Sequence, residues 1–468
     1  MGNQLKKEYE DISEQPSATG GLGLRWRLFQ AKQKSNQQKV TIFWLDKKSI
    51  PKNLRNDRYF ELFKQSVDRC YKIKHPYILK NTPNKQQAIF GGSKRDCSKE
   101  SNGSGGGGGG GGDGTNSNQS SENVDPLIKQ HKFGDLEIKL GLSELCEAVL
   151  FLHRDAHMIH GFINPCNIYI TESGDWKLFG FPFREHISVE TEEINIREKY
   201  DFIKTNELPY YPSLDCLAPE YIRTKAITAK SDAFSIGRIA YMIHRYKSGI
   251  RRDKSITSED EYRRAVNEWS THGFHTQGIP NDLVDGLRGL LQIEAGQRTD
   301  IKSFCSCKYF ADTVLRVLLY LEKLLEKEEA SRIAFLKNLP RVYYLFIFFF
   351  LKGGGMNFFF LKKKKKNPFK TNVIEQFEPM LLRTKVLPPL LLQMKDSRLV
   401  LAVMPSIFKM TEVLSADDFR TVIQPAIQPY LLGEQIPPQL FYYVIVNIDI
   451  IVKKVSVDSK RELIVPLI

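Results

Sequence analysis

One stretch of the chain constrains its fold more than any other. It runs His160-Gly161-Phe162-Ile163-Asn164-Pro165-Cys166-Asn167, and Gly180-Phe181-Pro182 follows thirteen residues later. Short apolar runs at Ile168–Ile170 and Trp176–Phe179 predict two strands between these segments. A loop therefore leads into a strand pair and a second loop, and neither loop segment carries a carboxylate.

These two segments have the layout of the catalytic centre of protein kinases, in which H-R-D is followed by four residues, N, a strand and D-F-G. His160 and Asn167 keep the spacing between the kinase His and Asn. Phe162 stands where the catalytic base Asp belongs, and Gly180 stands where the magnesium-binding Asp belongs. A chain that keeps the frame and lacks the acids is expected to bind rather than catalyse.

The upstream positions that hold nucleotide in a kinase are also altered. Gly20, Gly21 and Gly23 precede a predicted strand and form a degenerate nucleotide loop. The strand that should end in V-A-I-K reads Val40-Thr41-Ile42-Phe43, so Phe43 replaces the lysine. Because phosphoryl transfer needs lysine, metal and base, we predict no catalytic residues, no metal site and no cofactor. Residual ATP binding without magnesium stays open.

Other polar residues offer weaker routes to catalysis. His153-Arg154-Asp155 spells H-R-D, but Asp155 stands twelve residues before Asn167 instead of five, so it belongs to the end of a helix. Asn167, the only surviving ligand position, is a poor magnesium site without a carboxylate beside it. Hydrogen bonding to the loop backbone is its alternative role. Asp175 and Asp215 are near in sequence, but no pattern selects them.

The structural anchors of a kinase-like lobe are present. Ala218-Pro219-Glu220 matches A-P-E, and Arg298 stands where kinases place the arginine that pairs with that glutamate. Asp232 matches the Asp that caps the following helix and holds the catalytic loop. Losing a buried polar anchor is costly, so a chain that keeps anchors while losing catalytic groups indicates selection on shape.

Length and charge bear on domain count and on partners. A chain of 468 residues is long enough for about two to four domains. The net charge of +14 suits an anionic membrane surface, although five of these charges lie in the run 362–366. We predict peripheral membrane contact and no nucleic-acid partner. Of the seven cysteines only Cys305 and Cys307 are close, which is too sparse for a four-ligand zinc cage.

Composition divides the chain into regions. We predict a disordered N-terminus over 1–17 and a kinase-like domain over 18–310, with a disordered glycine-rich insert at 92–122. The insert falls where a kinase places the hinge that grips adenine. HEAT-like helical repeats are expected over 311–468, interrupted by a low-complexity segment at 343–370. Translated non-coding sequence is our hypothesis for that segment, and a membrane hairpin or basic membrane anchor is the alternative.

Hydrophobic periodicity predicts the main elements. The β-rich runs lie at 26–31 and 39–45, and the helical patterns lie at 59–73, 137–153, 233–246 and 311–328. Proline-containing segments then echo one another at Val386–Leu391, Val422–Ile427 and Leu463–Ile468, with the spacing of paired-helix repeats. Ser415, followed by Asp418, has the pattern of a helix N-cap.

Taken together, these segments resemble the Scy-like pseudokinases, and within them the branch associated with coated vesicles. The resemblance covers about residues 18–330 and continues from 372. Five stretches carry it: Gly20–Trp26, Val40–Lys48, His160–Asn167, Gly174–Lys177 and Leu217–Tyr221.

The resemblance implies an α+β fold, a bilobal protein-kinase-like domain followed by an all-α HEAT-type solenoid. It implies a catalytically inactive scaffold or adaptor in clathrin- or coatomer-linked vesicle traffic between Golgi and endosomes. The implied partners are clathrin, adaptor complexes or coatomer, and membrane-bound cargo machinery. The implied location is cytoplasmic, peripheral on Golgi, endosome and coated-vesicle membranes. A weakly active Ser/Thr protein kinase and a regulatory kinase-like subunit of a lipid kinase are the alternatives.

Overall fold

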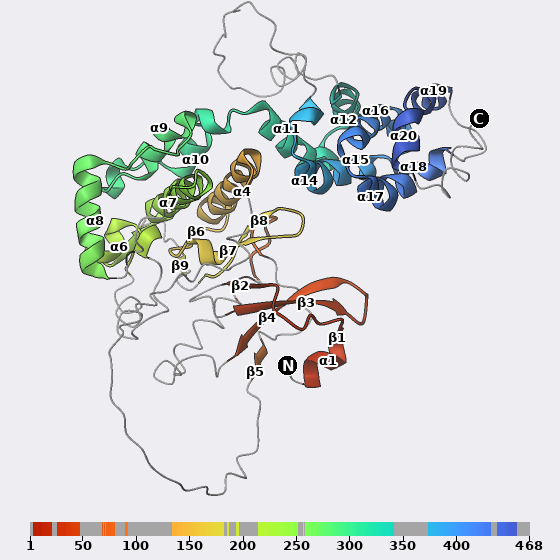
Figure 1. Cartoon of the computed structure of the whole chain (residues 1–468). Helices are drawn as coiled ribbons and strands as arrows, with labels where there is room; N and C mark the ends of the chain where they lie inside the picture. The colour runs from red at the N-terminus through yellow and green to blue at the C-terminus, as the bar shows by residue number, and fades with distance from the viewer. Residues whose placement is uncertain are drawn as a thin grey trace, which may run out of the picture. The chain divides into compact units, whose positions relative to one another are not determined.

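The computed structural model consists of two compact units (Figure 1). The kinase-like unit comprises residues 1–133, 144–169 and 177–304, and the helical unit comprises residues 134–143, 170–176 and 305–468. The structure describes residues 3–20, 26–46, 68, 70, 72–79, 89–91, 133–181, 185–186, 193–195, 214–250, 256, 258–340, 373–431 and 438–455.

The kinase-like unit begins with a five-stranded sheet of order β1-β3-β4-β5, with β2 also paired to β3. Strands β3 and β4 are antiparallel and confirm the β-rich runs predicted at 26–31 and 39–45. Phe29, Ala31 and Ile42 form a small buried cluster on this sheet. The strand bounds are Tyr9–Glu10 (β1), Ala18–Gly20 (β2), Trp26–Gln33 (β3), Lys39–Asp46 (β4) and Ile89–Gly91 (β5).

The beginning of the chain differs from the disorder expected over residues 1–17. Helix α1 covers Asn3–Glu8, and β1 pairs with the end of β3. Further along, the backbone N–H of Ser17 donates to the carbonyl of Leu28 at 2.7 Å. The polar composition suggested a free segment, but main-chain pairing to a strand edge needs no apolar side chains. The sequence pattern could not reveal that pairing.

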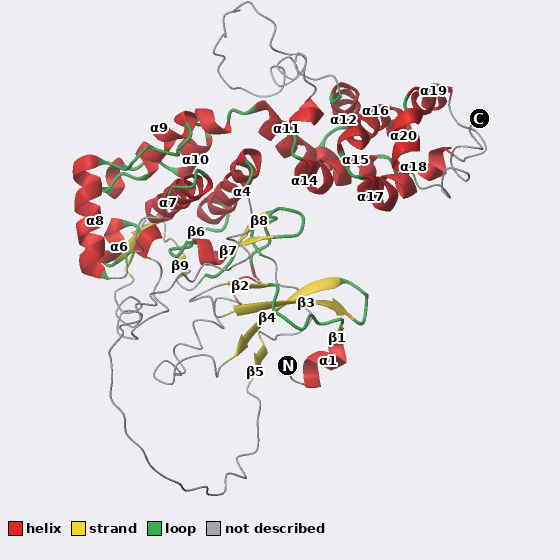
Figure 2. Ribbon diagram, viewed as in Figure 1, coloured by secondary structure: helices red, strands yellow, loops and turns green. Residues whose placement is uncertain are grey.

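The rest of the kinase-like unit is mainly helical, with short strand pairs (Figure 2). The helices predicted at 137–153 and 233–246 are confirmed as α4 and α7, and the strands around 168–170 and 176–179 are confirmed as β7 and β8. The helices are Asp135–Arg154 (α4), Pro219–Arg223 (α6), Ala229–Lys247 (α7), Glu259–His272 (α8), Asn281–Leu290 (α9) and Ile301–Cys305 (α10). The strands are Met158–Ile159 (β6), Ile168–Ile170 (β7), Trp176–Leu178 (β8), Glu185–His186 (β9), Glu193–Asn195 (β10) and Ala226–Thr228 (β11).

The described part of the helical unit from residue 305 onward contains helices and no strands (Figure 2). Its core is a continuous cluster of buried Leu, Ile, Val, Met and Phe side chains. The fold class predicted from sequence, an α+β kinase-like domain followed by a helical region, is confirmed. The helices are Thr313–Glu322 (α11), Glu329–Asn338 (α12), Pro379–Leu381 (α14), Leu387–Gln393 (α15), Ser397–Val413 (α16), Ala416–Asp418 (α17), Gln424–Leu431 (α18), Pro438–Val446 (α19) and Ile448–Lys454 (α20).

Two of the proline-containing segments share an unusual local geometry. A π-helical turn at Leu382–Val386 precedes α15, and another at Phe419–Ile423 precedes α18. Proline lacks an N–H and crowds the carbonyl four residues earlier, so a wider turn before it relieves the clash. The third segment, at 463–468, lies outside the described residues.

The predicted N-cap at Ser415 is confirmed. The Ser415 hydroxyl accepts a hydrogen bond from the Asp418 backbone N–H at 3.0 Å. It also donates to the Asp418 carboxylate at 2.6 Å. The cap satisfies one of the donors that a helix start leaves open.

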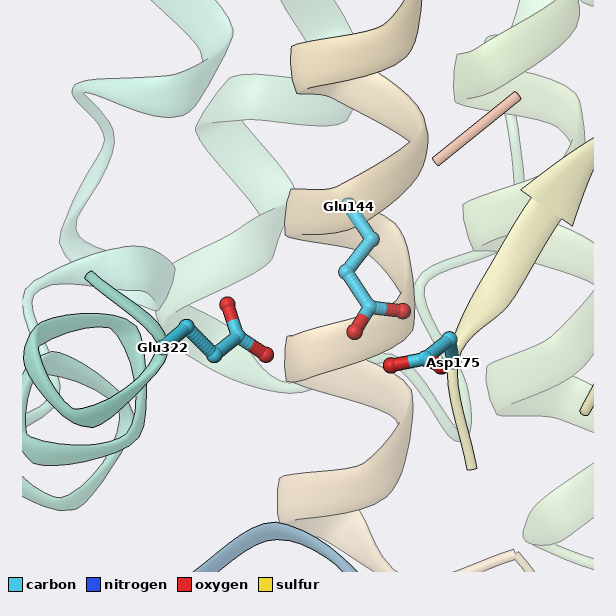
Figure 3. A group of neighbouring side chains, drawn as sticks. All are labelled: Glu144, Asp175 and Glu322. Atoms are coloured by element: carbon cyan, nitrogen blue, oxygen red, sulfur yellow. The ribbon is translucent and has the colours of Figure 1, made fainter. Parts of the chain in front are cut away.

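Two mid-chain segments belong to the helical unit. Lys139, near the start of α4, forms an ion pair of 2.6 Å with Asp312. Lys385 is buried, pairs with Asp175, and lies 3.6 Å from Glu322. Figure 3 draws the carboxylates of Asp175 and Glu322. Asp175 is therefore committed to a buried ion pair and is not free to replace a catalytic acid.

Several predictions lie largely or wholly outside the described residues. These are the glycine-rich insert at 92–122, the segment at 343–370, and all but four positions of the helix expected at 59–73. Among the described helices, none combines the length and the apolar character needed to cross a bilayer.

Candidate functional site

The loop at His160 is held by a carboxylate from α7. The backbone N–H groups of His160 and Gly161 donate to the two oxygens of Asp232, at 2.9 and 2.8 Å. The Nε2 atom of His153 lies 2.9 Å from the same carboxylate. Asp232 is buried, so these three partners replace the water that it has lost. The structure thus places Asp232 where it fixes the loop, and it adds His153, which the sequence pattern offered only as part of a displaced H-R-D.

His160 is neutral in this arrangement. Its Nδ1 accepts a hydrogen bond from the Phe162 backbone N–H at 3.2 Å, so its Nε2 donates to the Phe179 carbonyl at 3.3 Å. Burial lowers the pKa of His160 to about 4, although the nearby Asp232 charge opposes that shift. Both nitrogens of this neutral imidazole are engaged with the backbone, so the ring orients the loop and neither nitrogen is free to exchange a proton with a substrate.

Phe162 belongs to the core of the lobe. Its side chain is buried, and it packs in a cluster with residues of α6, α8 and β11, including Tyr221, Ile227 and Tyr262. The Phe162 carbonyl accepts hydrogen bonds from the side-chain amide of Asn167 at 3.0 Å and from that of Asn164 at 3.0 Å. The position that would carry a base therefore has an apolar ring turned into the protein.

Asn167 and Gly180 lie against each other at the position of the metal ligands. Gly180 has φ +80°, a conformation that favours glycine, and a Cβ added there would lie 2.8 Å from Asn167 Oδ1. That oxygen is buried and accepts no hydrogen bond from a described residue. Because the Asn167 amide fills the space beside residue 180, a carboxylate could not enter without moving it. Asn167 serves the loop backbone, as its alternative role predicts.

Three rings meet where the sheet faces the loops of the kinase-like unit; we call Phe43, Tyr169 and Phe179 the aromatic group. The Phe43 ring centroid lies 5.4 Å from each of the other two, and Tyr169 and Phe179 are 5.6 Å apart. Trp26, which is buried, adds an edge contact to Phe43 at 6.4 Å. Edge-on and tilted rings at these distances attract one another. The ring that replaces the kinase lysine is thus packed against other rings.

Tyr169 closes this group against the glycine turn. Gly20 lies so near the Tyr169 ring that a methyl group at Gly20 would overlap it. The Tyr169 hydroxyl is buried without a described hydrogen-bond partner, and burial raises its pKa well above the ordinary value. Gly21 and Gly23 lie outside the described residues. The lack of a side chain at Gly20 therefore lets the backbone come close to Tyr169 of the same chain.

These residues do not fit a magnesium–nucleotide complex. A phosphate cradle needs a lysine and hard oxygen ligands for the metal. The corresponding positions hold Phe43, Phe162 and Gly180, and the one remaining amide oxygen, on Asn167, is enclosed beside Gly180. We therefore derive no catalytic step through ATP or magnesium.

The anchor positions meet in a buried network. Arg298 Nη1 and Nη2 donate to the two oxygens of Glu220 at 2.8 and 3.1 Å. Arg298 also donates to the carbonyls of Gln292, Lys230 and Ile293. The Ser231 hydroxyl donates to Glu220 at 2.7 Å. A fully buried guanidinium with these partners joins α6, α7 and the segment after α9.

The remaining candidate acids have roles away from Asn167 and Gly180. Asp215 accepts a hydrogen bond from the Ile256 backbone N–H at 3.0 Å. Asp155 follows the last turn of α4, where its N–H donates to the Phe151 carbonyl. Sequence reasoning missed Tyr169 and Phe179 as site residues, although Tyr169 lies on β7 and Phe179 directly follows β8. An aromatic residue two positions after Asn167 was the available signal.

Comparison with known proteins agrees with this geometry. Residues 117–310 match the protein kinase domain family. Over its whole length the chain is 26% identical to SCY1-like protein 2 of Mus musculus, of which it covers 46%. The chain is a Scy-like kinase-like protein. This Scy-like chain is also 26% identical to protein kinase domain-containing protein ppk32 of Schizosaccharomyces pombe, with 95% of the chain and 56% of the relative covered.

A third relative carries a statement on activity in its name. The Scy-like chain is 21% identical to probable inactive serine/threonine-protein kinase scy1 of Dictyostelium discoideum, over 69% of the chain and 33% of the relative. The chain spans about half the length of the curated relatives it matches, and less of this one.

Proposed function

We propose that this chain is a kinase-like scaffold without phosphotransferase activity, acting as an adaptor in clathrin- or coatomer-linked vesicle traffic between Golgi and endosomes. The observation that carries the first half is the aromatic group. Phe43 packs 5.4 Å from both Tyr169 and Phe179 at the position where a kinase needs a cation for the phosphates.

The missing groups add to this obstacle. Removing a general base typically costs about 10²–10⁴-fold in rate. Removing the cation and a metal ligand takes away the electrostatic stabilisation that dominates phosphoryl transfer. The name of the Dictyostelium relative supports the same proposal for this chain.

The adaptor half rests on the Scy-like resemblance and on the retained anchors. Asp232 and the Glu220–Arg298 pair hold the lobe in a kinase-like shape without serving chemistry. A preserved shape offers a surface for partners, and the proposed partners are clathrin, adaptor complexes or coatomer, with peripheral contact to Golgi, endosome or coated-vesicle membranes. We also propose that the helical unit is a HEAT-type solenoid.

Labelling with radioactive γ-phosphate tests the first half. The purified chain is expected to transfer no more label to itself or to a general protein substrate than a buffer control. A weakly active kinase would instead give ATP-dependent labelling that disappears in Asn167→Ala. Label transfer well beyond the control would overturn the proposal.

Capture of the chain from cells tests the second half. Coat or adaptor subunits should be recovered with the wild type and lost when residues 305–468 are deleted. Recovery of a stoichiometric lipid kinase without coat subunits would contradict the adaptor proposal. It would support the alternative that the chain is a regulatory subunit of a lipid kinase.

A further inference from the structure

A cavity of about 500 Å³ lies in the helical half of the kinase-like unit. Its lining residues come from α7, α8, the segment after α8, and the end of α9 with the segment that follows, and none belongs to the aromatic group. Cavities of ~300–1,000 Å³ are typical of small-molecule sites. Five lining residues are apolar, Phe234, Trp269, Phe274, Leu291 and Ile293, and the others are polar, charged or glycine.

One buried cation faces this cavity. Arg238, on α7, is a lining residue and is only 6% exposed. Its guanidinium carbon lies 4.4 Å from the centre of the Trp269 ring, so the group stacks on an aromatic wall. Its Nε donates to the Asp215 carbonyl at 2.7 Å.

The other two guanidinium nitrogens are the unusual feature. Neither Nη atom of Arg238 has a hydrogen bond or ion pair with any described residue, and neither is sealed from the cavity. A buried charge without a counter-charge is expensive. Two parallel N–H donors form the fork that binds a carboxylate or phosphate in a bidentate manner.

The neighbouring charges already have partners. Arg288 pairs with Asp285 at 3.2 Å, and Glu294 pairs with Arg223 at 2.8 Å. Among the described arginines that line the cavity, Arg238 is therefore the one whose positive charge is not paired with a carboxylate. A single cation matches a singly charged carboxylate better than a phosphate monoester, which carries about two charges at pH 7.

We propose that this cavity binds a small organic carboxylate whose apolar body lies against Trp269 and Phe234 while its head group bridges the two Nη atoms of Arg238. This site is independent of the proposed scaffold function. Its ligand supplies the counter-charge that the fold leaves out.

The test measures binding of 3-phenylpropionate to the full chain by calorimetry, with 3-phenylpropionamide and phenethyl phosphate as comparison probes. The acid should bind at least about tenfold more tightly than the amide, because a hydrogen bond to a charged group is worth about one such factor or more. Equal binding of acid and amide overturns the proposal. Tighter binding of the phosphate overturns the choice of a carboxylate.

Three variants separate the site from general stability. Arg238→Met should bring the acid down to the affinity of the amide. Ser270→Trp places a large ring at the exposed rim of the cavity and should abolish binding of both probes without removing a buried contact. Arg264→Met, an exposed change on the same helix, should bind as wild type. If Arg238→Met does not fold, Ser270→Trp tests the location of the site instead. Unchanged binding of the acid to the folded Ser270→Trp variant would overturn the proposal.

Discussion

The degenerate catalytic positions of the kinase-like unit have lost their charged side chains, whereas its anchor network has kept them. Phe43 and Phe162 occupy positions that carry charge in an active kinase, and other rings pack around each of them. In the anchor network, Glu220 and Arg298 keep a buried bidentate ion pair. A catalytic group can be replaced by an apolar ring without harm to the fold, whereas removal of one partner of a buried pair leaves an uncompensated charge. A chain can therefore lose the catalytic groups of a kinase and still keep the kinase-like fold.

The largest effect is expected at the anchor. Arg298→Met should lower the free energy of unfolding by about 3–5 kcal/mol, because Glu220 would lose its buried counter-charge. Urea titration monitored by circular dichroism measures this loss. Arg223→Met breaks the exposed pair with Glu294 and should cost at most about 1 kcal/mol. Similar losses in the two variants would contradict the contrast between anchor and surface.

The next effect concerns the aromatic group. Phe43→Ala should lower the free energy of unfolding by about 2–3 kcal/mol, at the lower end for a phenylalanine because Phe43 is only half-buried. The matched control is Tyr246→Ala, an exposed aromatic of α7 in the same unit, which should change stability by less than about 0.5 kcal/mol. A Phe43→Ala chain as stable as wild type would mean that the rings do not support the fold.

A pH effect should arise from His160. Its pKa is about 4 in the folded protein, below the ordinary value of 6.5, so below pH 6.5 the unfolded chain binds a proton that the folded chain does not. Stability should therefore fall by about 2 kcal/mol between pH 7 and pH 5. Urea midpoints at the two pH values measure the change. His160→Gln should flatten the slope, whereas His272→Gln, at an exposed position, should retain it; a slope unaffected by His160→Gln would assign the effect to another group.

The smallest effect tests the contact between Gly20 and Tyr169. Gly20→Ala should destabilise the chain by about 1 kcal/mol, because the methyl group meets the Tyr169 ring. Tyr169→Leu should remove most of that penalty, and the double-mutant cycle should give a coupling of about 1 kcal/mol. Additive losses would place the ring away from Gly20.

Long periodic elements and spaced motifs could be predicted from the sequence. Helix α4, strands β3 and β4 and the Ser415 cap depend on local patterns. The pairing of Glu220 with Arg298 depends on a motif that fixes both residues. These features could be predicted because they depend on neighbouring residues or on a known spacing between motif residues.

Tertiary contacts between remote segments gave no comparable signal. Tyr169 approaches Gly20, and Lys385 pairs with Asp175, across separations that no periodicity records. The strand β1 was missed for the same reason, since its pairing uses main-chain groups that every sequence has. The cavity beside Arg238 likewise arises only when α7 and α8 are brought together.

The most direct measurement of the central claim is a thermal-shift titration of the full chain with ATP, with and without magnesium. Rings at the lysine and base positions and glycine at the metal-ligand position predict no magnesium-dependent rise in the unfolding midpoint. A magnesium-dependent stabilisation of about 3 kcal/mol, as expected for a ligand at a hundredfold excess over its Kd, would contradict the account.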